Sequence, residues 1–256
     1  MDKTLVIQSY RADNVSGWIK RCLQSVRAWT SLQGWHYQFV GDEIFERVPV
    51  WYRMRAKYSP PIITDLGRLL LIREALEAGF ETVYWVDADV IVFDPKNFIL
   101  GVGADYAFSR ELWVQSGAKG FKVYRNVHNA FCMFRQGNPF LEYYIHACLQ
   151  IMERVDGGVP NQIVGTKLLT AMHNMIGLPL VDQVGMISPL VLHDLGIGKG
   201  PALKCLLTAS TNALNAVNLC GSLVDQKIDG VRVDDGLMAR AVEFLLNEGP
   251  ATFSKQ

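Results

Sequence analysis

The strongest constraint on the fold is a short apolar run, residues 82–86, that ends in two aspartates. The run Thr-Val-Tyr-Trp-Val consists of residue types that favour β-strands, and Asp87 and Asp89 follow it two positions apart. In an extended chain this spacing puts both carboxylates on one face. Carboxylate oxygens are hard ligands that suit Mg²⁺ or Mn²⁺. The pattern therefore predicts a buried strand with a divalent-metal site at its exit.

Strand and helix patterns alternate through the first half of the chain. We expect strands at residues 4–10, 37–40 and 82–86, and helices at 15–30 and 64–78, with Thr64 as N-cap and Gly79 as stop. This order predicts an α/β fold with a mostly parallel sheet flanked by helices. Such sheets bind ligands at the carboxyl ends of their strands, where Asp87 and Asp89 are expected to lie.

The second half is expected to be mixed. The predicted elements are strands at 105–109 and 129–134, a helix capped by Asn138 and ending near 154, a helix at 161–175, an extended segment at 180–187, a mostly buried helix within 205–224 and a last helix from Asp234 or Asp235 to about 247. No linker separates the halves. We expect a single domain over 1–256, with a nucleotide-binding half (1–100) and a sugar and acceptor half (101–256).

Composition excludes some functions. Lysine plus arginine equals aspartate plus glutamate at 25 each, so no basic excess suggests a nucleic-acid partner. Five scattered cysteines without a C-x-x-C pair favour a reducing compartment, and no basic-then-apolar leader opens the chain. The uncharged stretch 205–224 contains too many asparagine, serine and threonine residues for a membrane span. The expectation is a cytoplasmic protein without a membrane span.

Further polar residues could belong to the same site. Asp65 and Arg68 stand at i, i+3, so they form either an intrahelical ion pair or a polar pair that faces the site. Residues 193–199 contain H-x-x-G-x-x-K, in which His193 could ligate Mn²⁺ and Lys199 could meet a phosphate. Asn129 and Gln162 open expected elements, where amides are commonly caps.

Taken in order, these motifs resemble those of a retaining glycosyltransferase of the GT-A fold. The glycogenin and lipopolysaccharide-galactosyltransferase family (family 8) has an apolar strand ending in D-x-D, then N-A-G, D-Q and H-x-x-G-x-x-K-P-W. The matching residues are Asp87-Ala88-Asp89, Asn129-Ala130-Phe131, Asn161-Gln162 and His193 to Lys199. The preceding Asp65-x-x-Arg68 is similar to the DXD sugar-binding family (family 32-like) of yeast mannosyltransferases and clostridial glucosylating toxins. The resemblance covers residues 1 to about 201, and Phe131, Asn161 and Gly200-Pro201 depart from it.

The resemblance implies a hexosyltransferase that moves a sugar from a nucleotide-diphosphate donor, expected to be a UDP-sugar, to an acceptor with retention. The acceptor would be a saccharide, a lipid-linked glycan or a protein. By this resemblance Asp87, Asp89 and His193 would bind Mn²⁺ (or Mg²⁺). The implied nucleotide and diphosphate contacts are Gln8, Ser9, Tyr10, Arg11, Ala88, Gly196 and Lys199. The implied donor-sugar contacts are Asp65, Arg68, Asn129 and Gln162.

Two alternatives remain open at this point. An apolar strand followed by D-x-D-x-Val also resembles the nucleophile strand of haloacid-dehalogenase-like phosphatases, with Asp87 as nucleophile and Asp234-Asp235 as the later acidic pair. The second alternative is a non-catalytic GT-A domain that binds a nucleotide without transferring a sugar. Trp113 and Tyr124 fall in expected loops, where they could stack on sugars or pack in the core.

Overall fold

The computed structural model describes residues 3–101, 103–118, 120–155 and 158–254. Its centre is a sheet in the order β2-β1-β3-β6-β5-β7. The bounds are β1 (Thr4–Ser9), β2 (His36–Val40), β3 (Thr82–Val86), β5 (Tyr106–Gly117), β6 (Gly120–Arg135) and β7 (Leu180–Val181). β1 is parallel to β2 and β3, β6 is antiparallel to β3 and β5, and β7 is parallel to β5. Among the strands of this sheet in the described ranges, β6 alone runs antiparallel to its neighbours. This arrangement confirms the α/β fold with a mostly parallel sheet.

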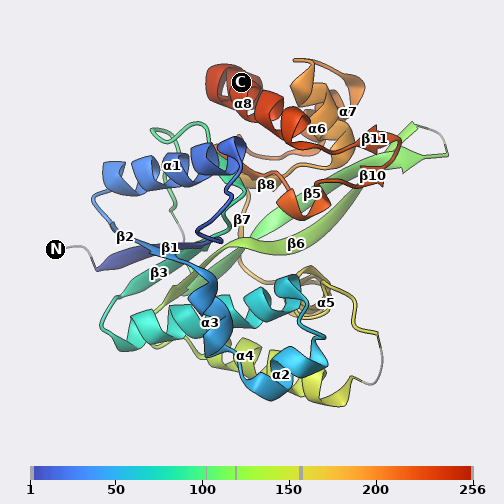
Figure 1. The fold of residues 1–256 in the computed structure, drawn as a ribbon. Helices are drawn as coiled ribbons and strands as arrows, with labels where there is room; N and C mark the ends of the chain where they lie inside the picture. Colours follow the sequence, from blue (N-terminus) through green and yellow to red (C-terminus); the bar gives the residue numbers. More distant parts are fainter. Residues whose placement is uncertain (1–2, 102, 119, 156–157, 255–256) are drawn as a thin grey trace.

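Helices cover both faces of this sheet (Figure 1). The bounds are α1 (Gly17–Leu32) on one face, and α2 (Val50–Arg55), α3 (Pro60–Glu77), α4 (Pro139–Arg154) and α5 (Thr166–Ile176) on the other. Because side chains alternate along a strand, β1 contributes to both interfaces. Leu5 and Ile7 share a core cluster with Ile72 of α3, whereas Val6 packs in a cluster with Trp29 of α1. Burial on both faces explains the continuous apolar strand sequences.

The remaining elements lie outside the six-stranded sheet and the helices that cover it. They are the three-stranded sheet β4 (Val90–Val92), β9 (Ala216–Asn218) and β8 (Val184–Met186), the hairpin β10 (Lys227–Ile228) and β11 (Val231–Arg232), the helices α6 (Pro189–Gly196), α7 (Pro201–Ala209) and α8 (Asp235–Phe253), and the 3-10 turns η1 (Asp42–Arg47) and η2 (Gly221–Leu223). None of the helices in the described ranges combines the length and apolar composition needed to cross a membrane.

Some predicted boundaries are confirmed and others are wrong. Asn138 caps α4 as predicted, and its side chain accepts hydrogen bonds from two backbone N–H groups, at 2.8 and 3.2 Å. Thr64 is not an N-cap, because α3 begins at Pro60. The first turn of a helix leaves backbone N–H groups without partners, and the two prolines that open α3 have no N–H group to leave unpaired. The helix predicted from Asn161 begins at Thr166, so Asn161 and Gln162 lie in a preceding turn.

The helix predicted within residues 205–224 is also wrong. α7 ends at Ala209, and the chain then forms an irregular segment and the short strand β9. Within this stretch Asn215 and Asn218 are buried and donate hydrogen bonds to Asp94 and Asp89. The last helix begins after Asp234 as predicted but continues to Phe253, past the expected end.

β5 and β6 are much longer than predicted. They pair over twelve residues of β5 and form a long ribbon, and β6 pairs with β3 only through residues 131–135 at its end (Figure 1). Between Phe108 and Ser109 the register shifts: Phe108 pairs with Cys132 but Ser109 pairs with His128. Residues 129–131 of β6 therefore bulge away from β5. Bulges of this kind redirect side chains, and this one lies beside the turn after β3.

Candidate functional site

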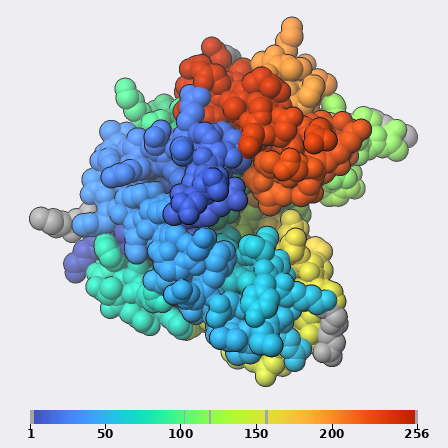
Figure 2. All heavy atoms as spheres, in the orientation of Figure 1, coloured from blue at the N-terminus to red at the C-terminus, as the bar shows by residue number. Residues whose placement is uncertain are grey.

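A cavity of about 1080 Å³ opens at the carboxyl ends of β1 and β3. Figure 2 shows the hollow between the red C-terminal segment and the cyan segment that contains α2 and the start of α3. It is lined by residues 9–11 after β1, 87–89 after β3, the start of α3, the β5–β6 ribbon and residues 220–223. This is the place where α/β sheets bind ligands.

The segment Asp87-Ala88-Asp89 is a turn rather than the extended chain that we predicted. The Val90 N–H donates to the Asp87 carbonyl over 3.1 Å, and the Asp87 N–H donates to the Ala130 carbonyl in the β6 bulge over 2.7 Å. The two carboxylates nevertheless both line the cavity, as do Ala88 and Asn129. The bulge and the turn thus fix each other at the cavity edge.

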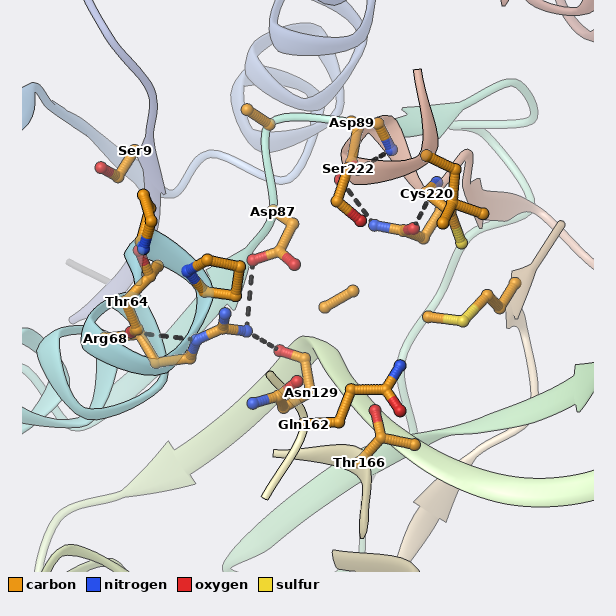
Figure 3. Close-up of a pocket in the computed structure, with 18 of the residues that line it drawn as sticks. Ser9, Thr64, Arg68, Asp87, Asp89, Asn129, Gln162, Thr166, Cys220 and Ser222 are labelled. Atoms are coloured by element: carbon orange, nitrogen blue, oxygen red, sulfur yellow. Dashed lines mark hydrogen bonds and ion pairs between the residues drawn. The ribbon is translucent and has the colours of Figure 1, made fainter. Parts of the chain in front are cut away.

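The Asp87 carboxylate has one oxygen engaged by protein donors. Trp85 Nε1 donates to Oδ1 over 2.6 Å, and Arg68 Nη1 lies 3.2 Å from the same oxygen. Figure 3 shows the other oxygen directed away from Arg68, toward the open part of the cavity. That oxygen is positioned to meet a ligand.

The Asp89 carboxylate is held by residues far along the chain. Asn218 Nδ2 donates to Oδ1 over 2.6 Å and the Gly221 N–H donates to Oδ2 over 2.7 Å. Burial, with the nearby charge of Asp87, raises the pKa of Asp89 to about 6. Two carboxylates that disfavour each other's ionised form are stabilised by a cation between them. This donor set fits a divalent ion, with water and ligand oxygens completing its shell.

Behind the turn lies a buried polar network of Asp65, Arg68 and Asn129. Arg68 Nη2 is 3.1 Å from Asp65 Oδ1, Arg68 Nη1 donates to the Asn129 carbonyl over 2.6 Å, and Asn129 Nδ2 donates to Asp65 Oδ1 over 2.8 Å. Burial raises the pKa of Asp65 to about 6, and the Arg68 guanidinium counteracts part of that rise. Both interpretations of the i, i+3 pair hold in part: it is an ion pair, and Arg68 also contacts Asp87 (Figure 3).

The predicted site residues fall into three groups. Those that line the cavity are Ser9, Tyr10, Arg11, Arg68, Asp87, Ala88, Asp89, Asn129 and Gln162. Gln162 lies across the cavity from Asp89, beside Thr166 (Figure 3). Asp65 and Gln8 lie behind the cavity wall: Asp65 holds Arg68 and Asn129, and Gln8 donates to the Asp87 carbonyl over 3.3 Å. The expected ligand contacts of Asp65 and Gln8 are therefore corrected to positioning roles.

The structure does not bring His193, Gly196 and Lys199 to this cavity. His193 is on α6 rather than in a loop, with its side chain half-exposed and Nδ1 3.6 Å from Asp194. Gly196 approaches Leu237 of α8. In the described ranges no three His, Cys, Asp or Glu side chains are grouped as a metal site, so the predicted union of His193 with the two aspartates is wrong. The glycine of this motif serves helix packing, because the missing side chain of Gly196 lets α6 and α8 approach closely.

The later acidic pair is likewise elsewhere. Asp234 caps α8 by accepting a hydrogen bond from the Leu237 N–H, and Asp235 accepts one from Trp18 Nε1 over 2.6 Å. Neither lines the cavity of Asp87. The phosphatase alternative therefore lacks its second acidic pair at this site.

Sequence reasoning missed much of the far wall. The missed polar lining residues include Glu111, Gln115, Asn126, Thr166, Cys220 and Ser222. A signal was available on β5, where Glu111, Trp113 and Gln115 alternate with Leu112 and Val114. This period of two indicates a strand with one polar face. Trp113 and Tyr124 therefore lie on β5 and β6 rather than in the loops that we expected.

Comparisons with known proteins give a distant likeness. No family model and no curated protein matches this sequence. Among solved structures, a glycosyltransferase involved in the glycosylation of the major capsid of PBCV-1 aligns with a TM-score of 0.49 and 12% identity, over 94% of this chain and 98% of that one. A structure from STIV aligns with a TM-score of 0.30 and 10% identity, over 67% of this chain and 78% of that one. Neither is close enough to assign a family or an activity.

Proposed function

We propose that this protein is a metal-dependent glycosyltransferase that moves a sugar from a UDP-sugar to an acceptor with retention. The observation that carries the proposal is the pair Asp87 and Asp89, presented by one turn at the exit of a buried parallel strand into a large cavity. The sequence of that turn and its partners Arg68, Asn129 and Gln162 resembles the donor site of GT-A enzymes. The cavity volume is also large enough for a nucleotide sugar, since ligand pockets typically span about 300–1,000 Å³.

Asp87 and Asp89 would hold a Mn²⁺ or Mg²⁺ ion, with the donor diphosphate and water as further ligands. The ion would neutralise charge as the nucleoside diphosphate leaves. Residues 9–11 line the same cavity at the end of β1, where the uracil and ribose would lie. Because Lys199 is elsewhere, Arg11 is the residue that we propose as the cationic diphosphate contact.

The donor sugar would lie between Asp89 and the opposite wall. Asn129 and Gln162 both line that part of the cavity and can donate or accept hydrogen bonds with hydroxyl groups. Retention would follow if the acceptor hydroxyl attacks from the side of the departing phosphate, which then takes its proton. This route requires no carboxylate nucleophile, and the amide of Gln162 would stabilise charge near the anomeric carbon.

Thermal unfolding with nucleotide sugars tests the proposal directly. UDP-glucose, UDP-galactose, UDP-N-acetylglucosamine and GDP-mannose would each be added with and without Mn²⁺, and hydrolysis of each donor would be followed by release of UDP or GDP. A ligand at 100 times its Kd stabilises the folded state by about 2.7 kcal/mol. We expect Mn²⁺-dependent stabilisation by a UDP-sugar and slow hydrolysis, both lost in Asp89→Ala and both kept in the control Asp105→Ala, whose carboxylate is exposed.

Three results would contradict the proposal in different ways. Absence of stabilisation by every nucleotide sugar with Mn²⁺ would remove the donor site altogether. Mn²⁺-dependent UDP binding without hydrolysis or transfer would favour the non-catalytic nucleotide-binding alternative. Undiminished donor turnover in Asp89→Ala would show that the aspartate pair is not the metal site.

A further inference from the structure

The β5–β6 ribbon presents a polar and aromatic ladder to the cavity. Glu111 pairs across the strands with Asn126, and Trp113 pairs with Tyr124. All four side chains line the cavity. Directly paired side chains in an antiparallel ladder are near neighbours, so the two rings reach the cavity from adjacent positions. This ladder forms the wall contributed by the second half of the chain.

The ribbon is attached to the rest of the protein by its other face, so the fold does not need the polar side chains that face the cavity. Leu112 and Val114 point the other way, are buried, and share a core cluster with Leu203 and Leu206 of α7. The ribbon is therefore anchored by its apolar face. A cavity face needed only for packing would favour apolar side chains as well, whereas Glu111 is a buried carboxylic acid, 6% exposed.

Glu111 is held in a defined position in this wall. Asn126 Nδ2 donates to its Oε1 over 2.8 Å, and burial raises the pKa of Glu111. The Tyr124 ring is held by Lys122, whose Nζ lies 4.2 Å from the ring centroid. A carboxyl group held by Asn126 thus lines the cavity beside the next cross-strand pair, which carries two aromatic side chains. One face of a pyranose ring is a surface of C–H groups, and its edge carries hydroxyl donors, so a sugar satisfies both features at once.

We propose that Glu111, Trp113, Tyr124 and Asn126 form an acceptor subsite for a saccharide, in which a pyranose ring lies against the two aromatic rings and one of its hydroxyls donates to Glu111. The proposal rests on the proposed glycosyl transfer, because a saccharide on this wall shares the cavity with the aspartate turn. It selects a carbohydrate among the acceptor classes, whether free or as the terminal unit of a larger glycan.

Direct saccharide binding tests the subsite without requiring turnover. Saturation-transfer NMR would be recorded on the full chain with the methyl α- and β-pyranosides of glucose, galactose, mannose and N-acetylglucosamine, and with the matching β-linked disaccharides. We expect the wild type to bind at least one, and Trp113→Ala and Tyr124→Ala each to weaken that binding tenfold or more. Trp51→Ala is the matched control, because Trp51 is 42% exposed and lies outside the residues that line the cavity. It should bind as the wild type does.

Glu111→Gln keeps the size of the side chain and so separates binding from folding. Charge-assisted hydrogen bonds are roughly twice as strong as neutral ones, so this variant should bind the saccharide several-fold more weakly at an unchanged Tm. Donor hydrolysis should stay within twofold of the wild type in the control Trp51→Ala, because Trp51 lies outside the residues that line the cavity. The subsite would be overturned if the wild type bound none of these saccharides. It would also be overturned if Trp113→Ala and Glu111→Gln both bound the saccharide as tightly as the wild type does. Lost donor binding would instead refute the proposed function.

Discussion

Replacement of Arg68 by methionine tests the central electrostatic feature of the site. Methionine fills much of the space of the arginine stem but removes the guanidinium. Arg68 is 5% exposed and bridges Asp65 at 3.1 Å, Asp87 at 3.2 Å and the Asn129 carbonyl at 2.6 Å. The variant therefore leaves a buried carboxylate and a buried carbonyl without their main partner. Removal of one member of a buried ion pair typically destabilises a protein by about 3–5 kcal/mol.

This penalty should depend on pH. The pKa of Asp65 is about 6 in the folded protein, above its unfolded value of about 3.9. The folded state thus binds more protons between these values, and stability rises as the pH falls through 6 toward 4. Because Arg68 lowers the pKa of Asp65, its removal raises that pKa further and enlarges the effect. With each pKa unit equal to about 1.4 kcal/mol, the penalty should be roughly 2 kcal/mol smaller at pH 5 than at pH 7.5.

Urea unfolding followed by circular dichroism measures both quantities. Each variant is compared with the wild type at the same pH, so other titrating groups cancel. Arg73→Met on the same helix is the control, because its ion pairs with Glu77 and Glu142 are exposed and worth about 0–1 kcal/mol. In a double-mutant cycle, Asp65→Asn should remove most of the pH dependence. A penalty below about 1 kcal/mol for Arg68→Met at pH 7.5, or one equal at both pH values, would refute the reasoning.

Three further predictions concern single side chains. Asp194→Ala should cost about 1–2 kcal/mol in urea unfolding, because Asp194 accepts the first two N–H groups of α7, at 2.7 and 2.9 Å. Gly165→Ala should lower Tm and donor affinity together, at a cost of about 1–3 kcal/mol, because a Cβ there would stand 2.6 Å from Asp65 Oδ2. Burial lowers the pKa of His128 to about 4. The folded state therefore loses stability as the pH falls from 6.5 to 4, and His128→Leu should remove about 3 kcal/mol of that loss between pH 7 and pH 4.

The first half of the fold was predictable because its patterns are local. The apolar run before Asp87 and the helix spacing around Trp18 and Val26 follow from burial on both faces of a sheet. The capping of α4 by Asn138 was equally local. Asp87, Asp89, Arg68 and their neighbours follow from the same reasoning, since strand ends meet at one edge of a parallel sheet.

The far wall of the cavity was not predictable in the same way. The β6 bulge exists because the pairing of β6 with β5 shifts by three residues between Phe108 and Ser109, a tertiary fact with no local signature. The prediction that His193 binds the metal has the opposite fault. The H-x-x-G-x-x-K spacing is typical of a ligand motif, but in this protein its glycine serves the packing of α6 on α8. The alternation of polar and apolar residues around Glu111 and Trp113 does indicate a strand. It was not assigned to one because β5 is unusually long and was expected to end at Ser109.

The hydrogen bond from the Gly221 N–H to Asp89 has a consequence for biosynthesis. It joins residues 132 positions apart. At synthesis rates of about 5–20 residues per second, residue 221 emerges roughly 7–26 s after Asp89. Until then this carboxylate lacks a partner that fixes its orientation, so a nascent chain carries the aspartate pair without its final geometry. Any ability to bind metal and donor through that geometry would thus be delayed until residue 221 has been synthesised.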